Sequence, residues 1–132
     1  LGVCTTDDIA ISVLTEIIGY RGNAGEWLVD AGWMALSRDR GTASQTVDCG
    51  YGLVCQESGE VIEDIFVRAT SQEHGILARR DGEPITPDRF QVGQRLRILP
   101  NHACATAAQH AGYWLVGEDL AGGRFWPRMH GW

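Results

Sequence analysis

The sequence contains no lysine, because all eleven of its basic residues are arginine. Enzymes that form a Schiff base use a lysine amine, so this chain cannot supply that group itself. Long apolar runs are also missing: no segment of the 132 residues approaches the roughly 20 apolar residues of a membrane span. No basic start followed by an apolar middle marks a signal peptide. The sequence therefore predicts a cytoplasmic protein without a membrane partner.

Positive charge and cysteine are both scarce. The formal net charge of -6 argues against a nucleic-acid backbone as partner. The four cysteines, at positions 4, 49, 55 and 104, do not form a dense disulfide framework, and we expect reduced thiols. The spacing between Cys49 and Cys55 is not that of a zinc knuckle or a redox pair, although a disulfide between these two residues stays open.

The glycine content predicts a single, mostly β domain over residues 1–132. Seventeen glycines and four prolines divide the chain into short segments, and no long helix is evident. Six of the ten residues from Ile9 to Ile18 are β-branched, which favours a strand over a helix capped by Thr6 or Asp7. Seven or eight short strands separated by turns indicate a closed barrel or a sandwich. The further strands are expected near residues 26–30, 52–56, 62–70, 75–80, 95–99, 113–117 and 124–126.

A histidine and a cysteine stand two positions apart at His102 and Cys104. On an extended strand, side chains at i and i+2 point to the same face, so both would reach one metal ion. Neutral imidazole and thiolate are ligands that Zn²⁺ takes. Two ligands leave positions for water or substrate, as in a catalytic site. The alternative is a packed histidine and a free cysteine without a metal.

Four blocks of sequence, taken together and in order, resemble one family: residues 30–41, 51–54, 71–75 and 92–104. The chain is similar, from about Asp8 to Trp132, to the C-terminal domain of the D-threonine aldolase and D-serine dehydratase family, pyridoxal-phosphate enzymes with an alanine racemase-like fold. The dehydratase-like members carry cysteine at the second metal-ligand position, where many aldolases carry aspartate, so Cys104 favours a dehydratase.

The resemblance implies a division of labour between two domains. An N-terminal barrel, absent from this chain, would carry pyridoxal phosphate and its lysine, and the full-length enzyme would form a homodimer. The present domain would supply a divalent metal ion through His102 and Cys104, for a D-3-hydroxy amino acid substrate. Thiolate softness favours Zn²⁺, while Mn²⁺ and Mg²⁺ stay open. The isolated chain is expected to be inactive.

Other residues of the matched blocks are weaker candidates. Glu73 is a candidate to orient His102 or a metal-bound water from outside the ligand set, against an ordinary ion pair with an arginine such as Arg79. Asp30, Ser37 and Asp39 are candidates to face the cofactor cleft, although the residues after Ser37 also resemble an ordinary turn.

Two other functions compete with the lyase. One is a binding or interaction module that reuses the β domain without catalysis. The other is a structural zinc domain with a closed site made of Cys49, Cys55, His102 and Cys104. His110 would extend such a cluster, but a packing histidine is the simpler interpretation.

Overall fold

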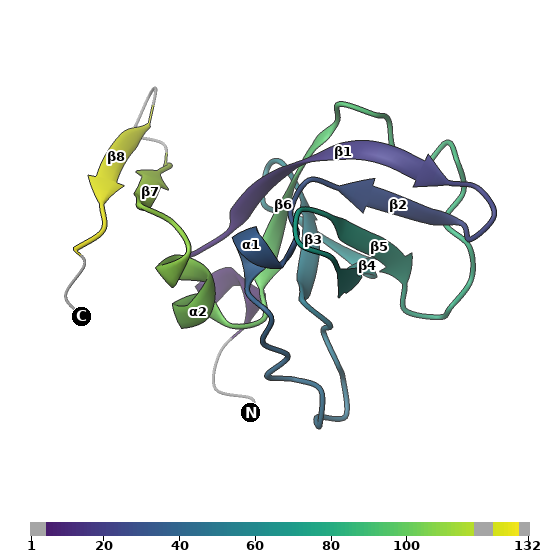
Figure 1. The fold of residues 1–132 in the computed structure, drawn as a ribbon, viewed down its shortest axis with the longest axis horizontal. Coiled ribbons are helices and arrows are strands. Elements are labelled where there is room, and N and C mark those ends of the chain that lie inside the picture. The colour runs from purple at the N-terminus through teal and green to yellow at the C-terminus, as the bar shows by residue number, and fades with distance from the viewer. Residues whose placement is uncertain (1–4, 118–122, 130–132) are drawn as a thin grey trace.

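The protein forms a six-stranded closed antiparallel barrel with a separate two-stranded hairpin (Figure 1). The computed structural model describes residues 5–117 and 123–129, so Cys4 and Trp132 lie outside the described residues. Around the barrel the strands follow the order β1-β2-β5-β4-β3-β6, and β7 pairs with β8. Their bounds are β1 Val13–Arg21, β2 Glu26–Val29, β3 Gly52–Gln56, β4 Val61–Thr70, β5 Gly75–Arg79, β6 Arg95–Pro100, β7 Gly112–Leu115 and β8 Arg124–Pro127.

The barrel closes around one apolar core, as the β-branched and alternating segments predict. Side chains from every barrel strand meet inside it, including those of Ile17, Trp27, Val54, Val67, Leu77 and Ile98. The predicted mostly β class and barrel-like architecture are confirmed. The strand expected from Ile9 begins instead at Val13, because its pairing with β6 begins where Val13 faces Ile98.

Three short helical segments were not anticipated. They are a 3₁₀ turn at Thr6–Asp8, α1 at Trp33–Leu36 and α2 at Ala103–Ala108. Alanine has the highest helix propensity, and α2 contains four alanines among its six residues. The expectation that His102 and Cys104 share a strand is therefore wrong: β6 ends at Pro100, and Cys104 lies in a helix. None of the helices in the described ranges is long and apolar enough to cross a membrane.

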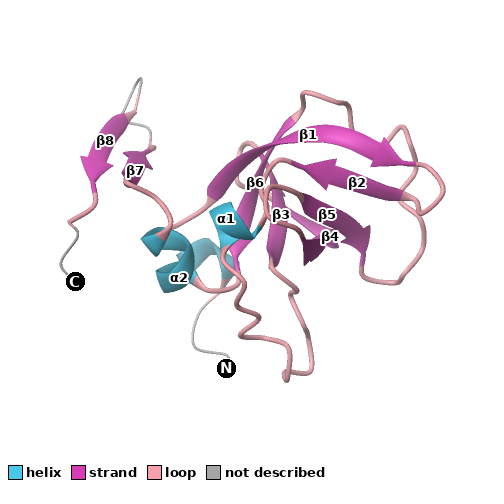
Figure 2. Cartoon of the chain, viewed as in Figure 1, coloured by secondary structure: helices cyan, strands magenta, loops and turns pink. Residues whose placement is uncertain are grey.

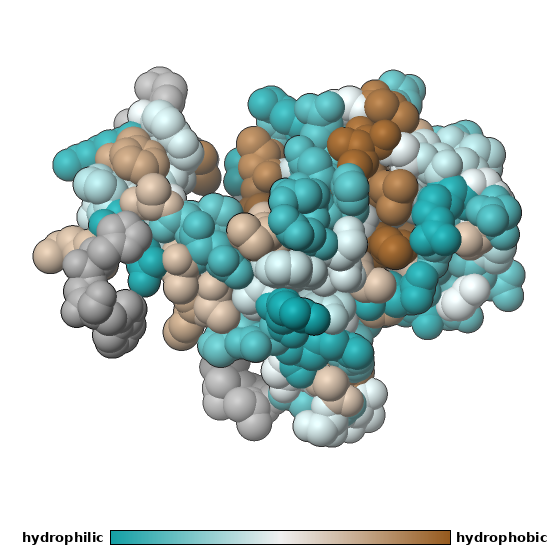
Figure 3. Space-filling view, viewed as in Figure 1, coloured by the Kyte–Doolittle hydropathy of each residue, from teal (hydrophilic) through white to brown (hydrophobic). Residues whose placement is uncertain are grey.

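One end of the barrel carries most of the irregular structure. Strand β2 leads into α1 there, and β6 leads into α2. The segment between α1 and β3 extends from the same end as a long loop (Figure 2). The hydropathy surface shows that the segment between α1 and β3 is mostly hydrophilic, whereas apolar side chains gather over β1 and β2 (Figure 3). Polar side chains from distant parts of the chain are thus brought together at this end.

Candidate metal-binding site

The imidazole of His102 lies where the barrel wall passes into α2. His102 is the N-cap residue of this helix, in an extended conformation, and its carbonyl accepts a hydrogen bond from the Thr106 amide at 3.0 Å. Its Nδ1 atom lies 2.6 Å from Oδ2 of Asp39, and both side chains are about half exposed, at 46% and 54%. This contact occupies one ring nitrogen and leaves Nε2 for another partner.

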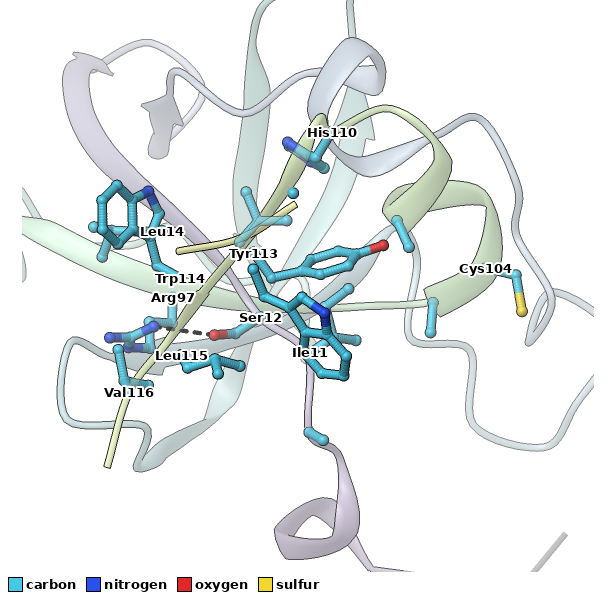
Figure 4. Close-up of a pocket in the computed structure, with 16 residues that line it drawn as sticks. Ile11, Ser12, Leu14, Arg97, Cys104, His110, Tyr113, Trp114, Leu115 and Val116 are labelled. Carbon is cyan, nitrogen blue, oxygen red and sulfur yellow. Dashed lines mark hydrogen bonds between the residues drawn. The ribbon is translucent and has the colours of Figure 1, made fainter. Parts of the chain in front are cut away.

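The thiol of Cys104 sits on the first turn of α2 and is exposed. Its sulfur points away from the apolar side chains gathered on the other side of the helix (Figure 4). Among residues 5–117 and 123–129, no three His, Cys, Asp or Glu side chains form a group that could hold a metal ion. His102 and Cys104 are therefore at most two ligands, and any others would come from water, substrate or another part of the protein.

Hydrogen bonds to the carbonyls of α1 fix the position of α2. The buried Thr106 hydroxyl donates to the Leu36 carbonyl at 2.7 Å, and the Gln109 amide donates to Trp33 at 3.1 Å. The His110 Nε2 atom lies 3.0 Å from the Ala35 carbonyl. The last carbonyls of a helix lack partners within it, and the side chains of Thr106 and His110 supply partners for those of Leu36 and Ala35. His110 thus has a packing role, as its simpler interpretation predicts.

The Thr106 hydroxyl offers a direct test of this docking. Thr106→Val keeps the shape of the side chain but leaves the buried Leu36 carbonyl without this partner. We expect the free energy of unfolding to fall by about 1–3 kcal/mol, as measured by urea denaturation. Thr46→Val is a control, since the side chain of Thr46 is exposed. An unchanged midpoint for Thr106→Val would show that the hydroxyl does not hold the two helices together.

A polar network holds the segment between α1 and β3. Arg40 and Thr42 contact the carboxylate of Asp48, and the Asn101 amide donates to Thr42 Oγ1 at 2.8 Å and to the Gly50 carbonyl at 2.5 Å. The backbone hydrogen bond from Gly50 is the main cause that lowers the pKa of Asp48 below its ordinary value. The segment is thereby tied to the residue just before His102.

Two other candidate carboxylates lie elsewhere. The Glu73 carboxylate accepts a hydrogen bond from the Gln72 side chain at 3.3 Å, while Arg79, its suggested ion-pair partner, contacts Asp81. The carboxylate that contacts His102 is that of Asp39, so a role for Glu73 beside the metal stays a prediction. Asp30 accepts hydrogen bonds from the Thr15 hydroxyl and the Glu16 amide, and it thereby joins β1 to the end of β2.

The cysteines do not form the closed zinc site considered above. Cys55 is fully buried in β3, and burial raises the pKa of its thiol. Cys49 is half-buried, and the thiols of Cys49, Cys55 and Cys104 are all free, so Cys49 and Cys55 form no disulfide. Because no group of three metal-ligating side chains exists in the described part of the chain, the four-ligand site is contradicted.

The exposure of these thiols predicts their reactivity. A thiolate reacts with alkylating reagents, and both burial and a raised pKa suppress it. We expect iodoacetamide to modify Cys104 rapidly and Cys55 only after unfolding, as measured by peptide mass spectrometry over time. Added Zn²⁺ is expected to slow the modification of Cys104. Equal rates at Cys55 and Cys104 would contradict the burial described above.

An apolar cavity of about 820 Å³ lies between the start of β1, α2 and the hairpin, and Cys104 is one of the residues that line it (Figure 4). Trp114 and Trp126 of the hairpin remain 67% and 62% exposed, whereas Trp27 is buried in the core. The cavity presents few polar groups to a ligand, since His110 is bonded to α1 and Arg97 to Ser12.

The chemistry of the donor set fits a divalent metal ion. A free Nε2 and an exposed thiol are the atoms that Zn²⁺ prefers, and a carboxylate on the opposite ring nitrogen is common beside histidine ligands. The sequence supplied both candidate ligands but not the contact with Asp39. The sequence contained one hint of this contact, because Asp39 lies with Ser37 in the block of residues 30–41 that resembles the family. That block did not indicate which residue Asp39 contacts.

Residues 10–116 match a family model described as "Putative serine dehydratase domain". The chain is 52% identical over its whole length to D-threo-3-hydroxyaspartate dehydratase of Delftia sp. strain HT23, of which it covers 35%. It is 36% identical over 95% of its length to D-serine dehydratase of Schizosaccharomyces pombe, of which it covers 28%. The chain thus spans about a third of the length of these relatives.

Solved structures show the same fold. A metal-free form of D-threo-3-hydroxyaspartate dehydratase with a cysteine changed to alanine superposes with a TM-score of 0.94 at 50% identity, over 99% of this chain and 35% of that one. In a second variant of that enzyme, the histidine two positions before the cysteine is changed to alanine. It superposes with a TM-score of 0.93 at 51% identity, over 99% of this chain and 34% of that one. An ala racemase-like protein from Idiomarina loihiensis gives 0.90 at 47% identity, over 99% and 34%.

Proposed function

The chain belongs to the serine dehydratase domain family, and from this premise we propose that residues 1–132 form the C-terminal domain of a longer lyase. The reaction is the dehydration of a D-3-hydroxy amino acid, because the relatives are a D-threo-3-hydroxyaspartate dehydratase and D-serine dehydratases. The share of the relatives that the chain covers, about a third, supports a further domain. A homodimer in the cytoplasm remains our prediction for the full-length protein.

We propose that His102 and Cys104 hold a divalent metal ion, with Zn²⁺ favoured over Mn²⁺ and Mg²⁺ by the thiolate. The observation that carries this proposal is that His102 has Nε2 free and that an exposed Cys104 thiol follows two residues later, at the start of the same helix. The histidine and cysteine changed in the two related variants also stand two positions apart, and one of those variants is described as metal-free. When bound, the ion would act as a Lewis acid on the leaving hydroxyl group.

The chain's own residues prepare that site. The hydrogen bonds between α2 and α1 hold His102 and Cys104 at a fixed position on the barrel. Asp39 can accept a hydrogen bond from His102 Nδ1, and in the neutral imidazole this tautomer leaves the lone pair on Nε2. The half exposure of His102 leaves room for a substrate hydroxyl and for ligands from another domain.

This domain has no residue that could bind pyridoxal phosphate covalently. The chain has no lysine with which to form a Schiff base, so we propose that the cofactor and its lysine belong to the N-terminal barrel. The isolated chain is accordingly expected to be inactive.

The test uses the natural polypeptide that contains residues 1–132, supplied with pyridoxal phosphate. We expect it to release ammonia together with oxaloacetate from D-threo-3-hydroxyaspartate, or with pyruvate from D-serine. A chelator should abolish this activity, and Zn²⁺ should restore it. Undiminished activity in metal-stripped protein would remove the metal from the mechanism. No ammonia from either substrate would favour the non-catalytic binding module.

A further inference from the structure

We propose that Asp39 is a positioning residue that holds the His102 imidazole with its proton on Nδ1 and its Nε2 lone pair free for a metal ion. This inference rests on the proposed function, because it concerns the same metal site. It adds a residue that comes from the other side of the barrel end, 63 positions earlier in the chain.

The distance between the two side chains supports this role. Asp39 Oδ2 lies 2.6 Å from His102 Nδ1, slightly shorter than the roughly 2.7–2.9 Å usual for a charge-assisted hydrogen bond. A carboxylate only accepts hydrogen bonds, so the Nδ1 atom must carry the proton. Neutral imidazole then presents an unprotonated Nε2, the form that binds a metal ion.

The backbone just before Asp39 is strained. Ser37 has φ 76° and ψ 172°, a combination that is essentially limited to glycine, yet its side chain is only 4% exposed. Its amide donates to the Trp33 carbonyl at 2.9 Å, and its hydroxyl accepts a hydrogen bond from the Asp39 amide at 3.3 Å. The chain is thus turned sharply out of α1 at Ser37, two residues before Asp39.

Both partners of the contact are fixed independently of it. His102 begins α2, which Thr106 and Gln109 tie to α1. The segment after Asp39 is tied through Arg40 and Asp48 to the end of the barrel. Two anchored segments therefore bring the carboxylate to the imidazole, whereas a chance surface pair would join two free side chains. Strain retained at such a place is a feature of functional sites.

The test compares Asp39→Ala, Asp39→Asn and Asp39→Glu in the natural polypeptide that contains this chain. Zn²⁺ affinity is measured by competition with a chromophoric chelator, and the tautomer of His102 by ¹⁵N NMR of the metal-free protein, with His102→Gln identifying the signal. We expect Asp39→Ala to weaken Zn²⁺ binding about 10- to 100-fold and to shift the proton of His102 partly to Nε2. Asp39→Glu should recover part of both effects.

Two controls separate this proposal from the one on which it rests. Asp64→Ala removes an exposed carboxylate that contacts Arg89 on another part of the barrel, and it should leave Zn²⁺ affinity unchanged. Asp39→Asn keeps the size of the side chain and serves if the alanine variant fails to fold. If His102→Gln and Cys104→Ser bind Zn²⁺ as tightly as the wild type, the metal site of the proposed function fails. If those two variants lose Zn²⁺ while Asp39→Ala keeps wild-type affinity and tautomer, the role of Asp39 alone is overturned.

Discussion

Replacing Cys104 by serine is expected to lower the lyase rate of the natural polypeptide about 100- to 1,000-fold. A Lewis acid stabilises the charge on a leaving oxygen by several kcal/mol, and each 1.36 kcal/mol corresponds to about a tenfold change in rate. Serine offers a neutral hydroxyl in place of a thiolate, and it is a far weaker ligand for Zn²⁺. The rate is measured as ammonia release, with metal content determined on the same samples.

The matched control is Cys49→Ser, at a half-buried thiol in the segment between α1 and β3. We expect this variant to keep both its metal and its rate. The prediction for Cys104 also has an internal check, because His102→Gln should lower the metal content in the same way. A Cys104→Ser protein with full activity and full metal content would show that the ligands lie elsewhere.

The second large effect concerns the barrel itself. Leu77→Ala should lower the free energy of unfolding by about 2–5 kcal/mol, the range for a large side chain removed from a packed core. Leu77 is completely buried in β5, where it faces Trp27 on one neighbouring strand and Val67 on the other. The vacated volume is enclosed by the barrel wall, which has little freedom to collapse into it.

The measurement is urea unfolding followed by circular dichroism. Val92→Ala is the control, because Val92 is 67% exposed and its truncation should change stability by no more than about 0.5 kcal/mol. If Leu77→Ala unfolds at the midpoint of the Val92→Ala control, then the barrel interior is not the source of the stability assigned to it.

Local patterns were sufficient to predict the strands. Strand β3 forms at the predicted residues, and β4 and β5 begin or end within one residue of their predicted bounds. The period of two in an alternating strand and the turn residues between strands are local signals. The helix α2 was missed because the motif of His102 and Cys104 was interpreted as part of the preceding strand. Its alanine-rich composition indicated a helix.

The candidate site was predictable only in part. Donor chemistry alone identified His102 and Cys104, and the resemblance to a family of lyases, now confirmed, gave them a shared role. The backbone geometry assumed for that pair was wrong, since the two residues start a helix. Glu73 stays a candidate to orient His102 or a metal-bound water, while the carboxylate that contacts His102 in the structure is that of Asp39.

The order of residues by itself determined the mostly β class, the absence of a Schiff-base lysine and the presence of a histidine and a thiol suited to a soft metal ion. Each of these follows from side-chain chemistry or from a repeat of a few residues. Only the tertiary structure decided which carboxylate meets His102 and which cysteines are buried. Closing the barrel brings the ends of β2 and β6 together, and contacts between residues so far apart in the chain leave no local pattern from which to predict them.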